Sequence, residues 1–360
     1  MRWSNQEEES GPEPALLPMS GFLRSVQTPD FAGVTFHEVQ AKSILNRVTA
    51  TSSMPFEWTI NPYRGCSHAC VYCFARKTHT YLDLDAGPDF DSQLVVKVNA
   101  GQVLAAELAK PSWRGAHVAM GTNTDPYQRA EGRYQLMPQI ISALADSGTP
   151  FSILTKGTLL GRDIPLLKEA SRQVDIGMGI SLALTDPSLA KRLEPGTPAP
   201  KARLQLVSRL RDAGLPCGVM AMPILPWLTD GDEALDSLFA RLAAAGATGV
   251  TAGPLHLRPG AREWFMTWLA KEHPQLVGRY RRLYGRGAYA PKEYRQWLES
   301  RVAYFKKVHG FSGGARFIRQ DRHRGSEQDR HPGDEQARRP GRHGEQPTRQ
   351  PERNQQPALF

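Results

Sequence analysis

The stretch Cys66-Ser67-His68-Ala69-Cys70-Val71-Tyr72-Cys73 is the most informative part of this 360-residue chain. Thiolates are soft ligands that favour iron–sulfur clusters, zinc or cuprous copper, so the three cysteines indicate a metal without choosing it. Three thiolates fit a four-iron cluster in which one iron stays open to another ligand. A closed zinc site needs four ligands, and the remaining cysteine, Cys217, lies far downstream.

His68 keeps a second hypothesis open. As a fourth ligand it would complete a Cys3His zinc site, and the chain would then be a zinc-binding nucleic-acid module. Between two cysteines, however, a spacer is the favoured interpretation of this histidine. Repeated strand and helix patterns also extend far beyond the cysteines, which a simple zinc module would not need.

The cysteine spacing, with Tyr72 directly before the last cysteine, resembles the signature of radical S-adenosylmethionine (SAM) enzymes. Other motifs narrow the resemblance to the spore photoproduct lyase-like branch, often labelled DNA repair photolyases. These motifs are Asn61-Pro62-Tyr63-Arg64-Gly65, Gly121-Thr122-Asn123-Thr124-Asp125-Pro126-Tyr127-Gln128, Thr155-Lys156 and Glu194-Pro195. The likeness runs from about Ala41 to about Leu257.

The resemblance implies a 4Fe-4S cluster held by Cys66, Cys70 and Cys73, with SAM bound to the open iron. The reduced cluster would cleave SAM to methionine and a 5'-deoxyadenosyl radical, which abstracts hydrogen from a substrate. By the same resemblance the substrate is a nucleic acid base, and a peptide or small metabolite is the alternative. An electron donor such as flavodoxin or ferredoxin would reduce the cluster.

The residues expected to contact SAM follow from the same motifs, and they are Tyr72, Gly121, Thr122, Asn123, Lys156 and Ser181. Gly121 would let the backbone approach the methionine part of SAM, and the two residues after it would meet the amino group. Lys156 would pair with the carboxylate, and Ser181 would bond to the carboxylate or the ribose. A solvated loop lysine is the alternative interpretation of Lys156.

Two departures from the branch bear on the substrate. The chain reads Thr155-Lys156-Gly157 where the branch commonly has Thr-Lys-Ser, which removes a hydroxyl. Spore photoproduct lyase also uses a cysteine as a hydrogen-atom donor, and the candidate here, Cys217, is better explained as a small buried thiol. These departures count against repair of the spore photoproduct itself, although a tyrosine can donate in principle. No catalytic side chain is assigned.

Strand-like and helix-like segments alternate between residues 35 and 310, which predicts an α/β core domain with a parallel sheet and a C-terminal helical extension. The expected strands are Glu57 to Ile60, His117 to Gly121, Phe151 to Thr155, Ile176 to Leu182, Gly218 to Ile224 and Gly249 to Ala252. Helices are expected after Asp163 and Asp232, and three glycines stand where helices should end, at Gly148, Gly214 and Gly246.

This pattern does not distinguish a barrel from an open doubly wound sheet, but the family resemblance implies a partial (β/α)6 barrel. In either fold the carboxyl ends of parallel strands meet at one edge. The cysteines and the Gly121, Lys156 and Ser181 motifs each follow or end an expected strand. They are therefore predicted to converge on one mouth.

Residues 1–34 and 311–360 are expected to be flexible segments outside the core. From Arg319 to Phe360, nine Arg face seven acidic residues, so this polar tail carries only +2 of the formal charge of +9. No run approaches the roughly 20 apolar residues of a membrane span. Four cysteines with three bunched together indicate a reducing compartment, so we expect a cytoplasmic enzyme without a membrane partner.

The strongest nucleic-acid pattern is Arg279-Tyr280-Arg281-Arg282-Leu283-Tyr284-Gly285-Arg286. Basic residues there alternate with aromatics that could contact phosphates and stack on bases. A solvated helix face is the more common explanation of such a run. A second aromatic group, formed by Trp264, Phe265 and Trp268, recurs at helical spacing and is expected in the core.

The residues Asp125, Tyr127 and Gln128 follow the second expected strand and are candidates to face the substrate. Their alternative interpretation is an Asp-Pro turn with a packing tyrosine.

Overall fold

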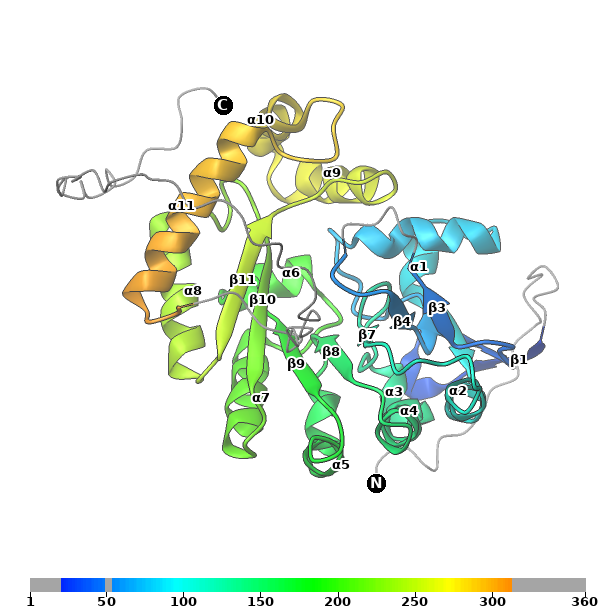
Figure 1. The fold of residues 1–360 in the computed structure, drawn as a ribbon. Helices are drawn as coiled ribbons and strands as arrows, with labels where there is room; N and C mark the ends of the chain where they lie inside the picture. Colours follow the sequence, from blue (N-terminus) through cyan, green and yellow to red (C-terminus); the bar gives the residue numbers. More distant parts are fainter. Residues whose placement is uncertain (1–20, 49–53, 313–360) are drawn as a thin grey trace, which may run out of the picture.

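The computed structural model describes residues 21–48 and 54–312, and its strands in these ranges form two sheets (Figure 1). The larger sheet has seven strands in the order β11-β10-β9-β8-β7-β4-β3. Their bounds are β3 Leu45–Arg47, β4 Trp58–Ile60, β7 Val118–Met120, β8 Phe151–Thr155, β9 Ile176–Ser181, β10 Cys217–Ile224 and β11 Gly249–Pro254. Each predicted strand is found within a few residues of its expected bounds.

The order of these strands decides the architecture. From β4 to β11 they are parallel neighbours in the order of the chain, and β3 runs antiparallel on the edge beside β4. A doubly wound sheet reverses its strand order near the middle. This sheet does not reverse, so the fold is the predicted partial barrel.

Helices between the strands cover the outer side of the curved sheet (Figure 1). They are α4 (Leu136–Asp146), α5 (Ile164–Ala170), α7 (Pro200–Asp212) and α8 (Asp232–Ala244). The short helix α6 (Pro187–Leu193) lies instead at the carboxyl end of the strands. As predicted, α5 begins after Asp163, and Gly148, Gly214 and Gly246 have left-handed φ angles of 68°, 83° and 78°. Glycine adopts this conformation without the steric cost of a Cβ, which lets the chain turn sharply after a helix.

Three helices follow the last strand, namely α9 (Ala261–Glu272), α10 (Pro274–Tyr284) and α11 (Lys292–Val308). The Tyr280 hydroxyl donates to the Pro226 carbonyl at 2.8 Å, and the Tyr284 hydroxyl donates to the Leu255 carbonyl at 2.9 Å. These bonds fix α10 to the loops that follow β10 and β11. No helix in the described ranges is long and apolar enough to cross a membrane.

A second sheet, in the order β1-β2-β6-β5, was not predicted. Its strands are β1 Phe22–Gln27, β2 Thr35–Val39, β5 Tyr63–Arg64 and β6 Gln93–Lys97. Residues 21–34 therefore do not belong to a flexible segment: they form β1, which pairs with β2, and a short 3-10 helix. The rest of the expected flexible segments, residues 1–20 and 313–360, lies outside the described residues.

Buried polar side chains explain why this sheet is hard to see in the sequence. Every residue of β2 is buried, although the strand contains His37 and Glu38. The His37 ring bonds to Ser25 at 2.9 Å and to Gln93 at 2.8 Å, both on neighbouring strands. Because these polar groups are satisfied by partners inside the sheet, the strand is buried without the apolar run that usually marks one.

Candidate functional site

The cysteine loop, residues 65–74, begins directly after β5. Gly65 has a left-handed φ of 84°, and the Cys66 amide donates to the Phe90 carbonyl at 2.9 Å, just before β6. The short 3-10 helix Phe74–Leu82 and the helix α1 (Pro88–Ser92) then lead back to the small sheet. The sheet that sequence reasoning missed therefore sets where the loop starts.

The thiols of this loop have the chemistry that a cluster requires. Cys66 and Cys70 are buried, Cys73 is half-buried, and all three are free. Burial raises the pKa of Cys70 well above its usual range and that of Cys73 to about 11, so a metal must displace protons on binding. Three soft donors on one short loop fit a cluster with an open iron.

The zinc interpretation depends on His68 as the fourth ligand. His68 instead pairs with Asp125, with 3.2 Å between Nδ1 and Oδ2. Burial alone would lower the pKa of His68, but Asp125 and Cys66 raise it to about 10. Asp125 thus engages the Nδ1 atom of His68, which favours the spacer interpretation.

Asp125 joins the cysteine loop to the loops after β7 and β8. Its Oδ1 accepts from the Tyr127 amide at 2.9 Å and the Thr155 hydroxyl at 2.5 Å, and its Oδ2 accepts from the Lys156 amide at 2.7 Å. Burial would raise the pKa of Asp125, but His68 and these donors lower it. Its position is that of an anchor between loops.

Gln128 and Thr124 hold the cysteine loop from the same side. The Gln128 side chain accepts from the Ser67 amide at 2.8 Å and donates to the Gly65 carbonyl at 3.1 Å. The Thr124 hydroxyl donates to that carbonyl at 2.7 Å. Tyr127 and Gln128 are fully buried, so the hypothesis that they face a substrate is wrong, whereas Asp125 is half-buried. The alternative of an Asp-Pro turn with a packing tyrosine is found, with the Gln128 backbone amide donating to the Asp125 carbonyl at 3.3 Å.

A buried carboxylate, Glu194, gathers charged partners on the other side of the loop. It lies 3.3 Å from Lys156 Nζ and accepts from Arg203 Nη2 at 2.5 Å and from the Tyr72 hydroxyl. Lys156 Nζ also donates to the Ser181 hydroxyl at 2.5 Å. The Lys156 side chain is only 13% exposed, so the alternative of a solvated loop lysine is wrong.

The charges of this group do not cancel. Burial would raise the pKa of Glu194, but Lys156, Arg203 and Tyr72 lower it to about 2, so it is an anion at neutral pH. Two cations surround this one carboxylate, which leaves one net positive charge close to Cys70 and Tyr72. A site of this kind attracts a further anionic group, because a buried unbalanced charge is costly.

The turn between α6 and α7 fits closely against the cysteine loop. The Val71 amide donates to the Leu193 carbonyl at 3.0 Å, and the Gly196 amide donates to the His68 carbonyl at 3.1 Å. A Cβ on Gly196 would lie 1.9 Å from the Ser67 carbonyl oxygen. Only glycine allows this approach, which carries Glu194 into the site.

Two glycines in the predicted motifs have packing reasons of their own. Gly121 has a φ of 91°, and a Cβ there would lie 1.9 Å from the Leu154 carbonyl oxygen on β8. A Cβ on Gly157 would lie 2.0 Å from the Tyr127 carbonyl oxygen. The serine that the branch commonly has at this position would not fit here without a backbone shift.

The other predicted SAM contacts lie at the same end of the sheet. The Thr122 hydroxyl and the Asn123 amide both point to the Asn61 side-chain oxygen, at 3.5 and 3.4 Å. Asn123 is exposed and Thr122 half-buried. The structure thus brings both Tyr72 and Ser181 to Lys156, whose Nζ lies 5.7 Å from the Tyr72 ring centroid and donates to the Ser181 hydroxyl. The Gly121–Asn123 segment lies on the neighbouring strand end.

Arg76 fixes the far side of the cysteine loop and was missed by sequence reasoning. It is fully buried, donates to the Cys70 carbonyl at 3.1 Å and pairs with both Asp91 oxygens at 2.9 Å. Its guanidinium lies 4.8 Å from the Trp264 ring centroid.

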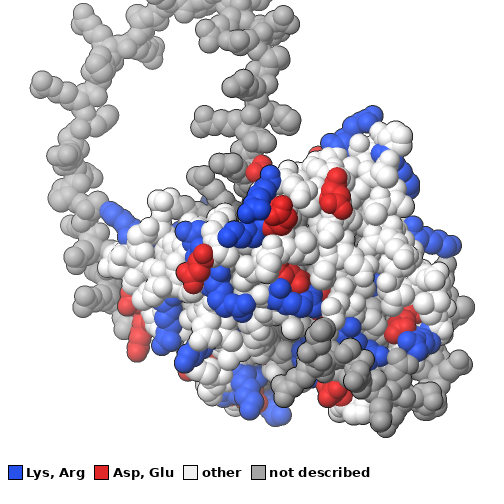
Figure 2. Space-filling view, turned by 90° about the horizontal axis from the view of Figure 1, so that it is seen from below, with Lys and Arg blue, Asp and Glu red and all other residues white. Residues whose placement is uncertain are grey.

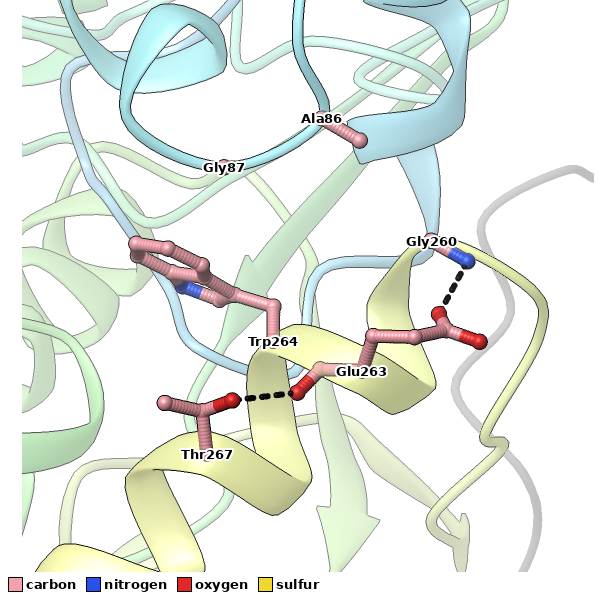
Figure 3. Close-up of a pocket in the computed structure, with 6 residues that line it drawn as sticks. All are labelled: Ala86, Gly87, Gly260, Glu263, Trp264 and Thr267. Atoms are coloured by element: carbon pink, nitrogen blue, oxygen red, sulfur yellow. Dashed lines mark hydrogen bonds between the residues drawn. The ribbon is translucent and has the colours of Figure 1, made fainter.

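Beside the Trp264 ring is a hollow of about 430 Å³ (Figure 3), lined by Ala86, Gly87, Gly260, Glu263, Trp264 and Thr267. None of the predicted cofactor residues lines it.

Cys217 is a buried thiol and the basic segment 279–286 lies largely on a solvated helix face, as the simpler interpretations predict. Cys217 is fully buried at the first residue of β10, opposite the mouth, where burial raises its pKa to about 12. Tyr280 and Tyr284 are buried in α10 and cannot stack on bases, whereas Arg281 and Arg282 are exposed. Phe265 is in the core, as expected, whereas Trp264 and Trp268 are half-buried and pack against it.

Comparisons with known proteins show the family of this chain. The Radical SAM superfamily model matches residues 60–239. An uncharacterized protein of Mycobacterium tuberculosis is 58% identical over 310 residues, covering 84% of this chain and 91% of the relative. An uncharacterized protein of Methanocaldococcus jannaschii is 28% identical over 193 residues, covering 54% of this chain and 69% of the relative.

Solved structures show the same fold. A spore photoproduct lyase complexed with dinucleoside spore photoproduct superposes with a TM-score of 0.58 at 15% sequence identity, covering 76% of this chain and 79% of that chain. The family match includes the cysteine loop, the Lys156 and Ser181 positions and the Glu194 turn. This chain belongs to the radical SAM superfamily.

Proposed function

We propose that this radical SAM enzyme holds a 4Fe-4S cluster on Cys66, Cys70 and Cys73 and uses it to abstract hydrogen from a nucleic acid base. When bound, the cluster supplies the electron that cleaves SAM to methionine and a 5'-deoxyadenosyl radical. The observation that carries the proposal is the net positive group formed by Lys156, Arg203 and Glu194 beside the cysteine loop, with Ser181 bonded to Lys156.

Lys156 and Ser181 are the residues that would bind the SAM carboxylate. A carboxylate that reaches Lys156 Nζ balances the excess positive charge of the group. The Ser181 hydroxyl, which now accepts from that ammonium, can turn to donate to an oxygen of the bound carboxylate. Glu194 and Arg203 act as positioning residues. They hold the lysine at the carboxyl end of β8 instead of letting its flexible stem sample solvent.

The backbone around Gly121 is the second part of the proposed SAM site. Thr122 and Asn123 offer a hydroxyl, an amide and a side-chain carbonyl on the strand end next to Lys156. Their present contacts to Asn61 are long, at 3.5 and 3.4 Å, so these groups are available to a ligand at little cost.

The substrate proposal has separate support. The motifs resemble the spore photoproduct lyase-like branch, and the fold matches a lyase solved with a dinucleoside photoproduct. Cys217 lies at the opposite end of the sheet from Lys156, so it cannot serve as the hydrogen donor of that lyase. A different base lesion or a base modification therefore fits this chain better. A flavodoxin or ferredoxin is the proposed electron donor.

Anaerobic purification and reconstitution test this proposal. The protein should bind about four irons, and dithionite with SAM should yield 5'-deoxyadenosine on chromatography. A colourless protein that holds one zinc and forms no 5'-deoxyadenosine would overturn it in favour of the zinc module. Turnover that is stimulated by a peptide or metabolite, and not by DNA or RNA, would replace the substrate class and leave the radical chemistry in place.

A further inference from the structure

An exposed aromatic and basic surface begins at the residue that follows the last cysteine of the loop. Phe74 is 48% exposed, and the Arg258 guanidinium lies 5.6 Å from its ring centroid. Arg258 also donates to the Tyr289 hydroxyl at 3.4 Å, and Tyr289 is 50% exposed. We call Phe74, His256, Arg258 and Tyr289 the aromatic–arginine rim.

The rim stands at the mouth of the barrel. His256 lies two residues after β11 ends, at the same end of the sheet where Lys156 follows β8. Its ring meets that of Tyr289 edge-on, with 4.7 Å between centroids. The Leu257 amide donates to the Ala288 carbonyl at 2.8 Å, which ties the loop after β11 to the loop that carries Tyr289. Three separate segments of the chain are thus held together there.

The chemistry of the rim suits one kind of ligand. Two half-exposed rings offer flat apolar faces, and a guanidinium between them is a planar donor for phosphate. Arg258 and Arg295 both lower the pKa of His256, after the larger effect of burial, which shows that positive charge gathers around this imidazole. By contrast, Lys and Arg side chains are interspersed with Asp and Glu on the face seen from below in Figure 2.

We infer that Phe74, Arg258 and Tyr289 receive a single-stranded or extruded stretch of the nucleic acid substrate. The rings stack on bases, and the guanidinium contacts a phosphate. The inference rests on the proposed function, because it assumes that the mouth is where the substrate reacts. The exposed arginines of α10 do not form such a surface, since the tyrosines between them are buried.

Anisotropy of a fluorescent short oligothymidine measures this binding on the reconstituted full chain. Arg258→Gln and Tyr289→Ala should each weaken the affinity about fivefold or more, as expected for a lost stacking or phosphate contact. Tyr289→Phe keeps the ring and should restore most of the affinity. The matched control is Arg281→Gln, which removes the same charge from an exposed site on α10 and should change the affinity by about twofold at most.

The salt dependence of the affinity adds a second readout. Arg258→Gln should reduce the slope of log K against log salt by about 0.7, the value for one phosphate contact on a single strand. Equal losses in Arg281→Gln and Arg258→Gln would mean diffuse charge attraction and overturn the inference. So would Arg258→Gln slowing reduction by flavodoxin without weakening oligothymidine binding, since the rim would then receive the electron donor.

Failure of the inference is distinct from failure of the proposed function. A native protein that forms 5'-deoxyadenosine but does not bind oligothymidine overturns the rim assignment alone. A protein that binds oligothymidine through Arg258 but holds no iron supports the rim and overturns the proposed radical chemistry.

Discussion

Two aromatic residues flank Cys73, and they differ in burial: Tyr72 is buried and Phe74 is exposed. Tyr72 is 9% exposed, and its hydroxyl donates to the buried Glu194, whereas Phe74 is 48% exposed beside an arginine at the surface. One side of the cysteine loop is therefore fixed by buried charge, and the other is open. Burial of a charge costs free energy, so each buried charge on the fixed side needs an oppositely charged neighbour, whereas the exposed ring carries no such cost.

The largest effect should come from the loop that joins the two sides. We expect Cys70→Ala to abolish SAM cleavage, because two thiolates cannot hold the proposed cluster. Iron content and 5'-deoxyadenosine formation measure this. Cys217→Ala is the matched control, since it removes another fully buried thiol at the opposite end of the sheet. Loss of iron from that control, or cleavage by Cys70→Ala, would contradict the assignment of the loop.

The fixed side predicts a large loss of stability on removal of its anion. Glu194→Gln leaves Lys156 and Arg203 buried without a countercharge, which should lower the free energy of unfolding by about 3 kcal/mol or more. Urea denaturation measures this difference. Glu169→Gln is the control, because its pair with Arg172 is largely exposed and should contribute at most about 1 kcal/mol. Similar losses of unfolding free energy in Glu194→Gln and Glu169→Gln would contradict a special contribution of the buried charges on the fixed side.

The same carboxylate predicts a pH dependence with a definite sign. The pKa of Glu194 falls from an ordinary 4.5 to about 2 on folding, so its ionised form stabilises the native state. Its contribution should be complete above pH 4.5 and disappear as the pH falls through about 2. Unfolding curves of native and Glu194→Gln proteins should therefore converge on acidification. Curves that stay parallel over this range would show that Glu194 is not ionised in the folded chain.

The smallest pair of effects compares the two aromatics directly. Tyr72→Phe removes one donor from buried Glu194 and should lower the free energy of unfolding by about 1–3 kcal/mol. Phe74→Leu changes a half-exposed ring and should alter it by about 0.5 kcal/mol or less. Thermal or urea unfolding of both variants measures the difference. A larger loss of stability in Phe74→Leu than in Tyr72→Phe would mean that the open side contributes more to the free energy of unfolding than the fixed side.

The sequence predicts the strands correctly where the buried residues are also apolar. The strands β8, β9 and β10 are predicted well because they are largely apolar, as parallel strands covered on both faces must be. The mouth follows from the rule that motifs at strand ends meet at one edge. The barrel order itself needed the structure, since alternating strands and helices fit two topologies.

Sequence reasoning failed where charged groups are buried. Nothing in the sequence singles out Arg76 and Arg203, because arginine is seldom fully buried without partners. Their partners, Asp91 and Glu194, lie 15 and 9 positions away, spacings that no regular helix or strand pattern pairs. The strand β2 was missed for the same reason, because His37 and Glu38 interrupt its apolar pattern.

The bond between Tyr72 and Glu194 joins residues 122 positions apart. On the ribosome, the cysteine loop must therefore emerge on the order of ten seconds before the segment that fixes it, at the usual rates of synthesis. During that interval the three thiols lie in an unfinished chain, exposed to oxidants and to any metal that is present. The loop reaches its final, buried arrangement only after Glu194 has emerged.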